Sequence, residues 1–286
     1  MPAFERYIGI DYSGAETPDS SLRGLRMYVA DGTSQPVEIP PPDGPKKYWT
    51  RRGIAERLVE LLSEGTPTLV GIDHSFSFPL RYFEKYGLAH DWTSFLKDFQ
   101  HHWPTDGEHT YVDFVRDGDH GNGAARTGKS TWRRIAEIRS GAKSVFHFDV
   151  PGSVAKSTHS GLPWLLYIRL RTAAHFWPFD GWEIPAGRSA VVEAYPALWS
   201  KSYAKEARDG HQHDAYSIAR WLRDADSNGS LSHFLNPPLE ERERKVAGIE
   251  GWILGVALAA SFTRPSRSLY PYDCLQCCYD PYRGLT

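Results

Sequence analysis

Cysteine is scarce in this chain, which has three in 286 residues: Cys274, Cys277 and Cys278. Three cysteines so close together cannot form the disulfide framework of a small secreted domain. Three thiolates could bind zinc, but the nearest histidine, His233, lies far upstream. We therefore interpret residues 263–286 as an ordinary C-terminal extension.

Long hydrophobic runs are also missing. The longest apolar stretch, from Gly251 to Phe262, is far shorter than the roughly 20 residues of a membrane-spanning helix. The segment from Met1 to Ile10 lacks the charged start and long apolar run of a secretory signal. We expect a cytoplasmic protein without a membrane partner. The sequence does not indicate an oligomeric state.

The chain has little excess charge of either sign. It contains 33 Lys and Arg against 35 Asp and Glu, a formal net charge of −2. The whole molecule therefore offers no field that attracts a polyanion, and any nucleic-acid site has to be a local basic patch. Hydrophobic residues make up 41%, enough to fill the core of one large domain.

Regular elements are expected in two blocks of the chain, residues 1–80 and 189–262. Apolar runs bounded by turn residues predict strands at Tyr7–Asp11, Leu25–Ala30, Pro36–Ile39, Thr68–Ile72 and Ala190–Pro196. Apolar residues at helical spacing predict helices at Arg52–Ser63, His213–Arg223 and about Leu239–Ala260. Together these elements predict an α/β core.

Residues 81–188 between the two blocks are rich in Gly, Pro, His and aromatic residues. We interpret them as a large irregular insertion or cap, because insertions commonly shape a site on a rigid scaffold. Candidate helices within it are Trp92–Phe99, Thr131–Arg139 and Trp164–Ala174.

Two of the predicted strands end alike, in Gly-Ile followed by Asp11 or Asp73 and then a polar turn. A charged carboxylate at the end of a buried strand is costly unless it is paired. This edge of an open α/β sheet is also where ligands bind. Two aspartates on adjacent strands repel each other, and Mg²⁺ or Mn²⁺, which prefers carboxylate oxygen, relieves that repulsion.

Three more carboxylates belong to this argument. Glu193 lies inside a predicted strand, Asp214 at the start of a helix, and Glu250 within the last helix. Each alone has an ordinary structural explanation, since Asp forms turns and caps helices. Jointly they favour a site with Asp11, Asp73 and Asp214 as metal ligands.

Five segments resemble one family, the predicted nucleases catalogued as domain of unknown function 429. They are Gly9–Ala15, Gly71–Pro79, Val192–Pro196, His213–Ala215 and Glu250–Ile253. The order of strand, hairpin, helix, strand and later helix also resembles the ribonuclease H-like superfamily. This resemblance covers Tyr7 to about Phe262. It implies a ribonuclease H-like mixed sheet flanked by helices, with metal-binding carboxylates, but supplies no established substrate.

One feature departs from that superfamily. Ribonuclease H proper carries a catalytic Glu on the first helix after the hairpin, and the helix here offers Glu56, Glu60 and Glu64, none within a motif. We therefore assign the fourth catalytic carboxylate to Glu193. Whether Glu193 or Glu250 completes the acidic site stays open.

These residues predict a divalent-metal-dependent phosphodiester hydrolase acting on nucleic acid or a nucleotide-like phosphodiester. With two ions, one activates water and the other stabilises the leaving oxygen. Asp11 would bridge the ions, and Asp73 and Asp214 would each hold one. His213, beside Asp214, could deliver a proton, although a lone histidine is more often structural.

The segment Gly123–Ser130 matches the P-loop expression G-x-x-x-x-G-K-[ST]. A P-loop binds phosphate when a buried strand feeds it, and Arg116–Asn122 indicates a loop instead. A basic patch suited to a phosphate backbone is the better interpretation, with Trp132 available for stacking and a solvated helix face as the alternative. Its proposed substrate-binding residues are Arg126, Lys129, Arg133 and Arg134.

Two other functions stay open. The first is a phosphotransferase or nucleotide-binding protein, because Gly9–Gly14 also resembles the phosphate loop of the sugar-kinase and actin superfamily. Its second domain copy and Gly-rich adenosine loop are not found after residue 190. The second is a non-catalytic nucleic-acid-binding protein, which the acidic residues disfavour because carboxylates without metal hinder phosphate binding. The sequence does not separate DNA, RNA and small-molecule substrates.

If Gly123–Ser130 is only a basic loop, Lys129→Ala should leave nucleoside triphosphate binding unchanged, because no phosphate contacts this lysine. Calorimetric titration with ATP and GTP measures this. Specific triphosphate binding that disappears in the variant would favour the phosphotransferase.

Overall fold

The computed structural model describes residues 2–256. The cysteine-containing extension, residues 263–286, and the end of the last predicted helix lie outside the described residues. Within residues 2–256, no helix is long and apolar enough to cross a membrane.

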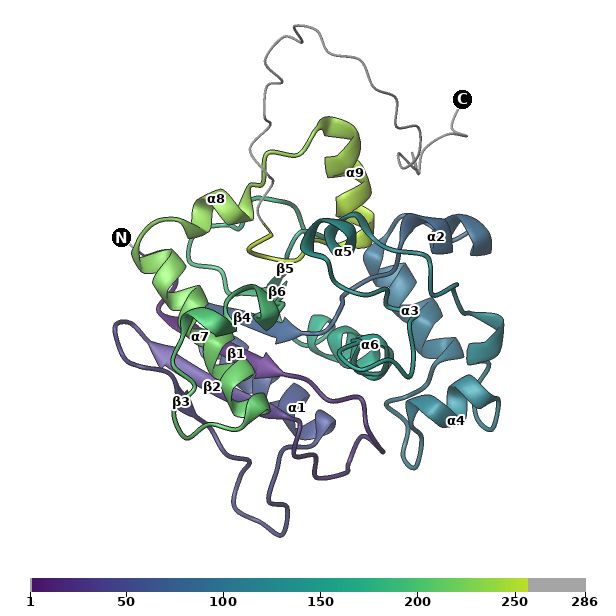
Figure 1. Cartoon of the computed structure of the whole chain (residues 1–286), viewed down its shortest axis with the longest axis horizontal. Coiled ribbons are helices and arrows are strands. Elements are labelled where there is room, and N and C mark those ends of the chain that lie inside the picture. Colours follow the sequence, from purple (N-terminus) through teal and green to yellow (C-terminus); the bar gives the residue numbers. More distant parts are fainter. Residues whose placement is uncertain (1, 257–286) are drawn as a thin grey trace, which may run out of the picture.

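A mixed sheet of six strands forms the centre of the protein (Figure 1). The strands are β1 (Arg6–Asp11), β2 (Arg26–Asp31), β3 (Val37–Glu38), β4 (Thr68–Asp73), β5 (His175–Phe176) and β6 (Ala190–Glu193). Their order is β3-β2-β1-β4-β6-β5. β2 is antiparallel to β1 and β3, whereas β4 is parallel to β1 and β6, and β6 to β5. The predicted α/β class and mixed sheet are confirmed.

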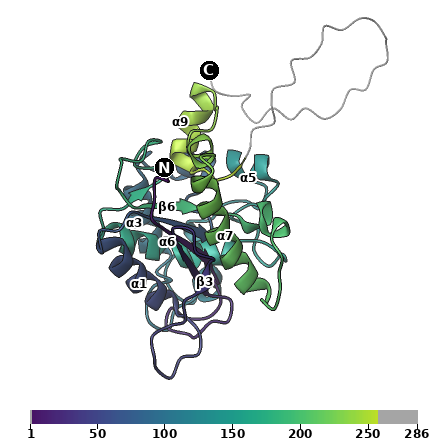
Figure 2. The same ribbon diagram turned by 90° about the vertical axis from the view of Figure 1, so that its left-hand side faces the viewer.

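Helices cover both faces of this sheet. The helices described are α1 (Arg51–Ser63), α2 (Leu80–Tyr86), α3 (Trp92–His102), α4 (Val112–Asp117), α5 (Ile135–Ser140), α6 (Ala155–Arg169), α7 (Gly210–Ser227), α8 (Leu231–Leu235) and α9 (Glu241–Glu250). Figure 2 shows α7 on one side of the sheet and α1 on the other.

Successive residues of β1 point to opposite faces of the sheet. Ile8 and Ile10 pack into a core cluster with apolar residues of α1, α3 and α6. The intervening Gly9 faces α7. Because β1 is buried on both faces, its sequence is a continuous apolar run, as expected for a central strand with a parallel neighbour.

Glycines allow α7 to approach the sheet closely. A Cβ on Gly9 would overlap the carbonyl oxygen of Ala215 and lie 2.5 Å from the amide of Ala219. A Cβ on Gly71 would lie 2.6 Å from Cγ2 of Ile218. These are the glycines of the two Gly-Ile-Asp strand ends, so the same motif that places the aspartates also makes room for α7.

The segment 81–188 shares its core with the sheet. Phe95 of α3 and Leu162 of α6 belong to the same cluster as Ile8 and Val70 of the central strands. β5, which the sequence did not predict, adds a strand beside β6. The elements of segment 81–188 named here are therefore part of the same hydrophobic core and sheet as the two flanking blocks.

Several predicted boundaries differ from the structure. The helix expected at Thr131–Arg139 begins at Ile135, with Glu137 bonded back to the amide of Arg134. α6 begins at Ala155 instead of Trp164, since a helix buried nearly all round shows no amphipathic period. α9 ends at Glu250, where Gly251 adopts φ +79°.

Gly9→Ala should destabilise the protein by about 1–3 kcal/mol, because the added methyl meets the backbone of α7, which cannot move without lifting off the sheet. Chemical denaturation measures the change. Gly248→Ala is the matched control, since nothing lies within 4 Å of its Cβ position in α9. Equal stability of the two variants would contradict the close packing of α7.

Candidate functional site

Two aspartates lie at the same level on adjacent strands. Asp11 and Asp73 are the last residues of β1 and β4, which are parallel, and they are paired in the register. This is the placement that the matched strand ends predict. On the next strand, Glu193 is paired with Ile72.

The start of α7 brings a third aspartate, Asp214, to this edge. Asp209 caps the helix by accepting from the amide of Gln212 at 2.8 Å, and the Gln212 side chain accepts from the amide of Asp209 at 2.9 Å. Arg26 of β2 lies 3.5 Å from the Asp209 carboxylate. The cap therefore holds the first turns of α7 against the hairpin, with Asp214 near the strand ends.

His211 is a site residue that the sequence reasoning missed. Its Nδ1 lies 2.7 Å from Oδ2 of Asp11, and this hydrogen bond raises the pKa of His211. The spacing of three residues between His211 and Asp214 places both on one helix face, which was the available signal. His213 instead donates from Nε2 to the carbonyl of Ser200 at 2.9 Å.

The three aspartates disfavour their own charges. Burial raises the pKa of Asp11, against the opposing effect of its hydrogen bond with His211. Burial, followed by the negative charges of Asp11, Asp214 and Glu193, raises the pKa of Asp73 well above its usual range. Burial, and then the charge of Asp11, raises the pKa of Asp214 to about 6. A positive charge placed between these three carboxylates would stabilise their ionised forms.

Among these three aspartates, one carboxylate oxygen is buried without a partner. Oδ1 of Asp73 makes no hydrogen bond within residues 2–256. Buried polar atoms are rarely left unpaired, because each costs desolvation energy that nothing returns. Among residues 2–256, however, no three His, Cys, Asp or Glu side chains already form a group that could hold a metal ion.

Glu193 lies beside this edge and is paired with a buried arginine. Arg134 reaches its two carboxylate oxygens at 2.5 and 2.8 Å, and the amide of Phe76 donates to it at 3.2 Å. Arg134 also binds Glu137 at 2.9 Å. Its side chain is fully buried, so it is not part of the basic surface on which the sequence placed it.

Glu250 also has a structural arrangement. Its two oxygens accept from the backbone amides of Leu80 at 2.7 Å and Ile135 at 2.8 Å. Burial raises its pKa to about 7. The carboxylate thus joins α9 to the starts of α2 and α5, and both of its oxygens accept from backbone amides there.

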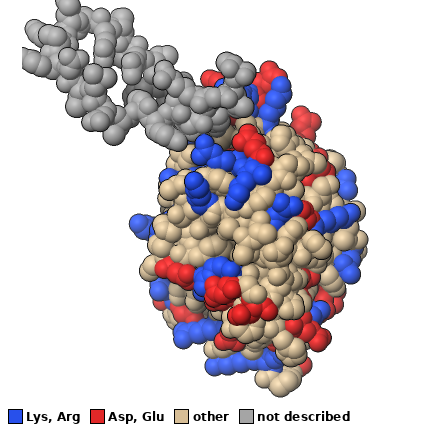
Figure 3. Space-filling view, turned by 90° about the vertical axis from the view of Figure 1, so that its right-hand side faces the viewer, with Lys and Arg blue, Asp and Glu red and all other residues tan. Residues whose placement is uncertain are grey.

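The remaining predicted substrate-binding residues are partly engaged elsewhere. Arg126 lies 3.0 Å from Asp98, and Arg133 donates to the carbonyls of Glu137 and Ala142, whereas Lys129 is exposed. On the face drawn in Figure 3, lysine and arginine are interspersed with acidic residues.

The P-loop match lacks its structural context. A helix, α4, precedes Gly123–Ser130, and the segment begins with a short 3-10 turn. A Cβ on Gly128 would overlap the ring of Phe146, and one on Gly123 would lie 2.7 Å from Trp103. Both glycines therefore serve aromatic packing.

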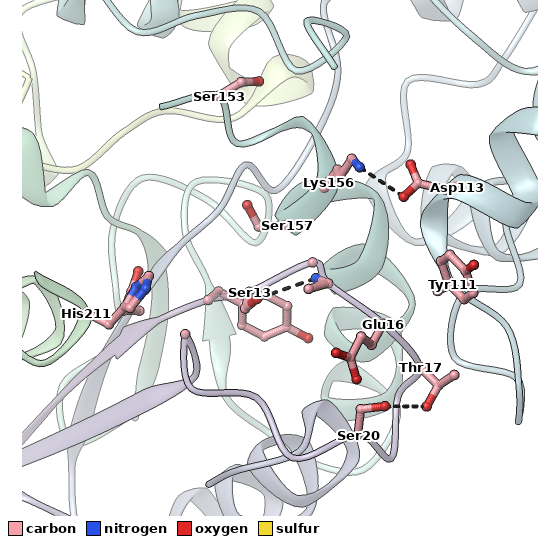
Figure 4. A pocket seen from close by; sticks show the side chains of 15 residues that line it. Ser13, Glu16, Thr17, Ser20, Tyr111, Asp113, Ser153, Lys156, Ser157 and His211 are labelled. Atoms are coloured by element: carbon pink, nitrogen blue, oxygen red, sulfur yellow. Dashed lines mark hydrogen bonds and ion pairs between the residues drawn. The ribbon is translucent and has the colours of Figure 1, made fainter. Parts of the chain in front are cut away.

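A pocket of about 660 Å³ opens beside Asp11 (Figure 4). The loop from Tyr12 to Thr17 forms one wall, and residues from Ser153 to Ser157 at the start of α6 form another. His211 lies at one end, with Tyr111 and Asp113 at the other. The walls of this pocket come from segments far apart in the chain, so no local pattern predicts it.

No protein-family model, curated protein or solved structure matches this chain.

Asp214→Asn should stabilise the metal-free protein above pH 6, by on the order of 1 kcal/mol after allowance for solvent screening. The folded-state pKa of Asp214, about 6, exceeds its ordinary value, so its ionisation opposes folding above that pH. Protonation removes the penalty as the pH falls through 6, and below pH 4 the two proteins should be equally stable. Thermal unfolding in chelator across this range measures the difference.

Asp43→Asn, at an exposed loop position, is the control and should show no such pH-dependent gain. A loss of stability in Asp214→Asn at pH 8 would mean that the ionised Asp214 carboxylate is favourable in the folded protein.

Proposed function

We propose that this protein is a divalent-metal-dependent phosphodiester hydrolase in which Asp11, Asp73 and Asp214 hold Mg²⁺ or Mn²⁺. The observation that carries the proposal is the buried, unpartnered Oδ1 of Asp73 beside two further carboxylates of raised pKa. A cation satisfies that oxygen and removes the mutual repulsion of the three groups.

The donor set fits such an ion. All three side chains offer carboxylate oxygens, which Mg²⁺ and Mn²⁺ prefer over nitrogen or sulfur. When bound, a divalent ion polarises a phosphoryl oxygen and lowers the pKa of a coordinated water. Asp11 would exchange its hydrogen bond with His211 for this ligand role.

The sheet supports assignment to the ribonuclease H-like superfamily. The resemblance implies a mixed sheet in which a strand ending in Asp11 and a hairpin are followed by a helix and a strand ending in Asp73. The order β3-β2-β1-β4, with β2 antiparallel and β4 parallel to β1, is compatible with it. We also propose that the chain belongs to the predicted-nuclease family catalogued as domain of unknown function 429, which its sequence resembles.

The protein's own residues orient the central carboxylate. Arg134 donates to Ser75 Oγ at 2.7 Å while binding Glu193, and Glu193 accepts from the amide of Phe76. Ser75 and Phe76 follow Asp73 directly. We therefore propose that Glu193 fixes the turn after Asp73 as a positioning residue, and is not itself a metal ligand.

Asp11→Asn should reduce stabilisation by Mn²⁺ and lower phosphodiester cleavage at least about 100-fold, because the change keeps the side-chain shape but removes a ligand charge. The metal-free variant should be as stable as the wild type or more so, since a repelling charge is gone. Melting curves across Mn²⁺ concentrations, beside cleavage of DNA, RNA and nucleotide diesters, measure both effects.

Glu60→Gln, at an exposed position of α1, is the matched control and should behave as the wild type. If Mn²⁺ does not shift the wild-type melting temperature and nothing is cleaved, the hydrolase proposal fails and a non-catalytic protein is favoured. An Asp11→Asn variant that is unstable without metal would instead identify Asp11 as a structural residue.

A further inference from the structure

The pocket beside Asp11 has the size of a small-molecule site. Its volume of about 660 Å³ falls within the roughly 300–1,000 Å³ of typical ligand pockets. Asp11 is part of its wall, while Asp73 and Asp214 are not, so the pocket meets the acidic edge at one of the three carboxylates. A molecule within it would therefore present one end to the proposed metal site.

Hydroxyl groups supply much of the polar lining. Ser13, Thr17, Ser20 and Ser157 are spread over the walls (Figure 4). A hydroxyl both donates and accepts, so such a lining can bind the hydroxyl and carbonyl groups of a sugar or base. Tyr111 adds an aromatic ring at the end away from His211.

Positive charge in the pocket is limited. In the described part of the chain, Lys156 is the only lysine or arginine that lines it, and its Nζ lies 2.9 Å from Asp113 and 3.3 Å from Asp149. Glu16 and Asp113 add negative charge to the same walls. A long nucleic acid requires several cations along its backbone, and these walls cannot supply them.

The loop that forms the wall is held from behind. The buried guanidinium of Arg51 donates to the carbonyls of Ser13, Ala15 and Glu16, at 3.3, 2.6 and 2.7 Å. On the other side, a Cβ on Gly14 would overlap the backbone of Lys156. The loop is thus fixed between α1 and α6, and the pocket is preformed.

We infer that this pocket binds the substrate, and that the substrate is a small phosphodiester of nucleotide size instead of a long nucleic acid, with Lys156 contacting a hydroxyl or carbonyl oxygen of its nucleoside at the end of the pocket away from His211. The inference rests on the proposed hydrolase function. It adds the substrate class and one further binding residue, and it assigns no role to the basic segment around Lys129.

The test compares cleavage of a dinucleoside monophosphate with cleavage of a long single strand of the same bases, both in Mn²⁺. Lys156→Met should raise KM for the dinucleoside monophosphate about tenfold, because a charge-assisted contact is lost. Lys156→Arg should restore most of the affinity. Ala15→Phe, at an exposed position of the wall, should abolish turnover by filling the pocket.

Lys97→Met, an exposed lysine on α3, is the matched control and should leave KM unchanged. In every variant the Mn²⁺-dependent rise in melting temperature should persist, because none of them removes a proposed ligand. Ala15→Phe keeps the test decisive if Lys156→Met fails to fold.

Preferred cleavage of the long strand, or a KM for the dinucleoside monophosphate that neither pocket variant alters, would overturn this inference and leave the hydrolase proposal standing. Absence of both the Mn²⁺ shift and all cleavage would overturn the hydrolase proposal and this inference with it.

Discussion

The close contact between α7 and the central strands is the constraint on which the candidate site depends. Asp214 reaches the ends of β1 and β4 because Gly9 and Gly71 offer no side chain to keep the helix away. A helix packed on a sheet through ordinary side chains stands farther off. The motif Gly-Ile-Asp therefore combines a close approach, a buried strand residue and a carboxylate in three consecutive positions.

The buried carboxylates near this edge are of two kinds, those paired with an arginine and those without such a partner. Arg134, fully buried, forms ion pairs with both Glu193 and Glu137, and desolvation makes these pairings indispensable once the three groups are inside. Asp73, nearby, receives no such partner for its Oδ1. In the same buried surroundings, Glu193 is therefore held in an ion pair, whereas the charge of Asp73 has to be balanced by a cation or a proton.

The strands and amphipathic helices were predictable from the sequence, since a run such as Tyr7–Asp11 carries its own signal of burial. α6 was placed too late, because a helix buried nearly all round lacks a polar face to set the period. The burial of Arg134 and the pocket wall at Lys156 depend on contacts between distant segments. Local spacing carries no information about such contacts. The three-residue spacing between His211 and Asp214, however, does indicate that both lie on one face of a helix.

The balance of charge at this edge also sets an order of events under the proposed function. When ionised, the three carboxylates repel a phosphodiester as well as each other, and a single lysine, already paired with Asp113 and Asp149, does not offset them. An anionic substrate therefore gains affinity only after a divalent cation has reversed the local field. Under the proposed function, metal binding would therefore precede substrate binding, and the net charge of −2 of the whole chain does not reveal this local requirement.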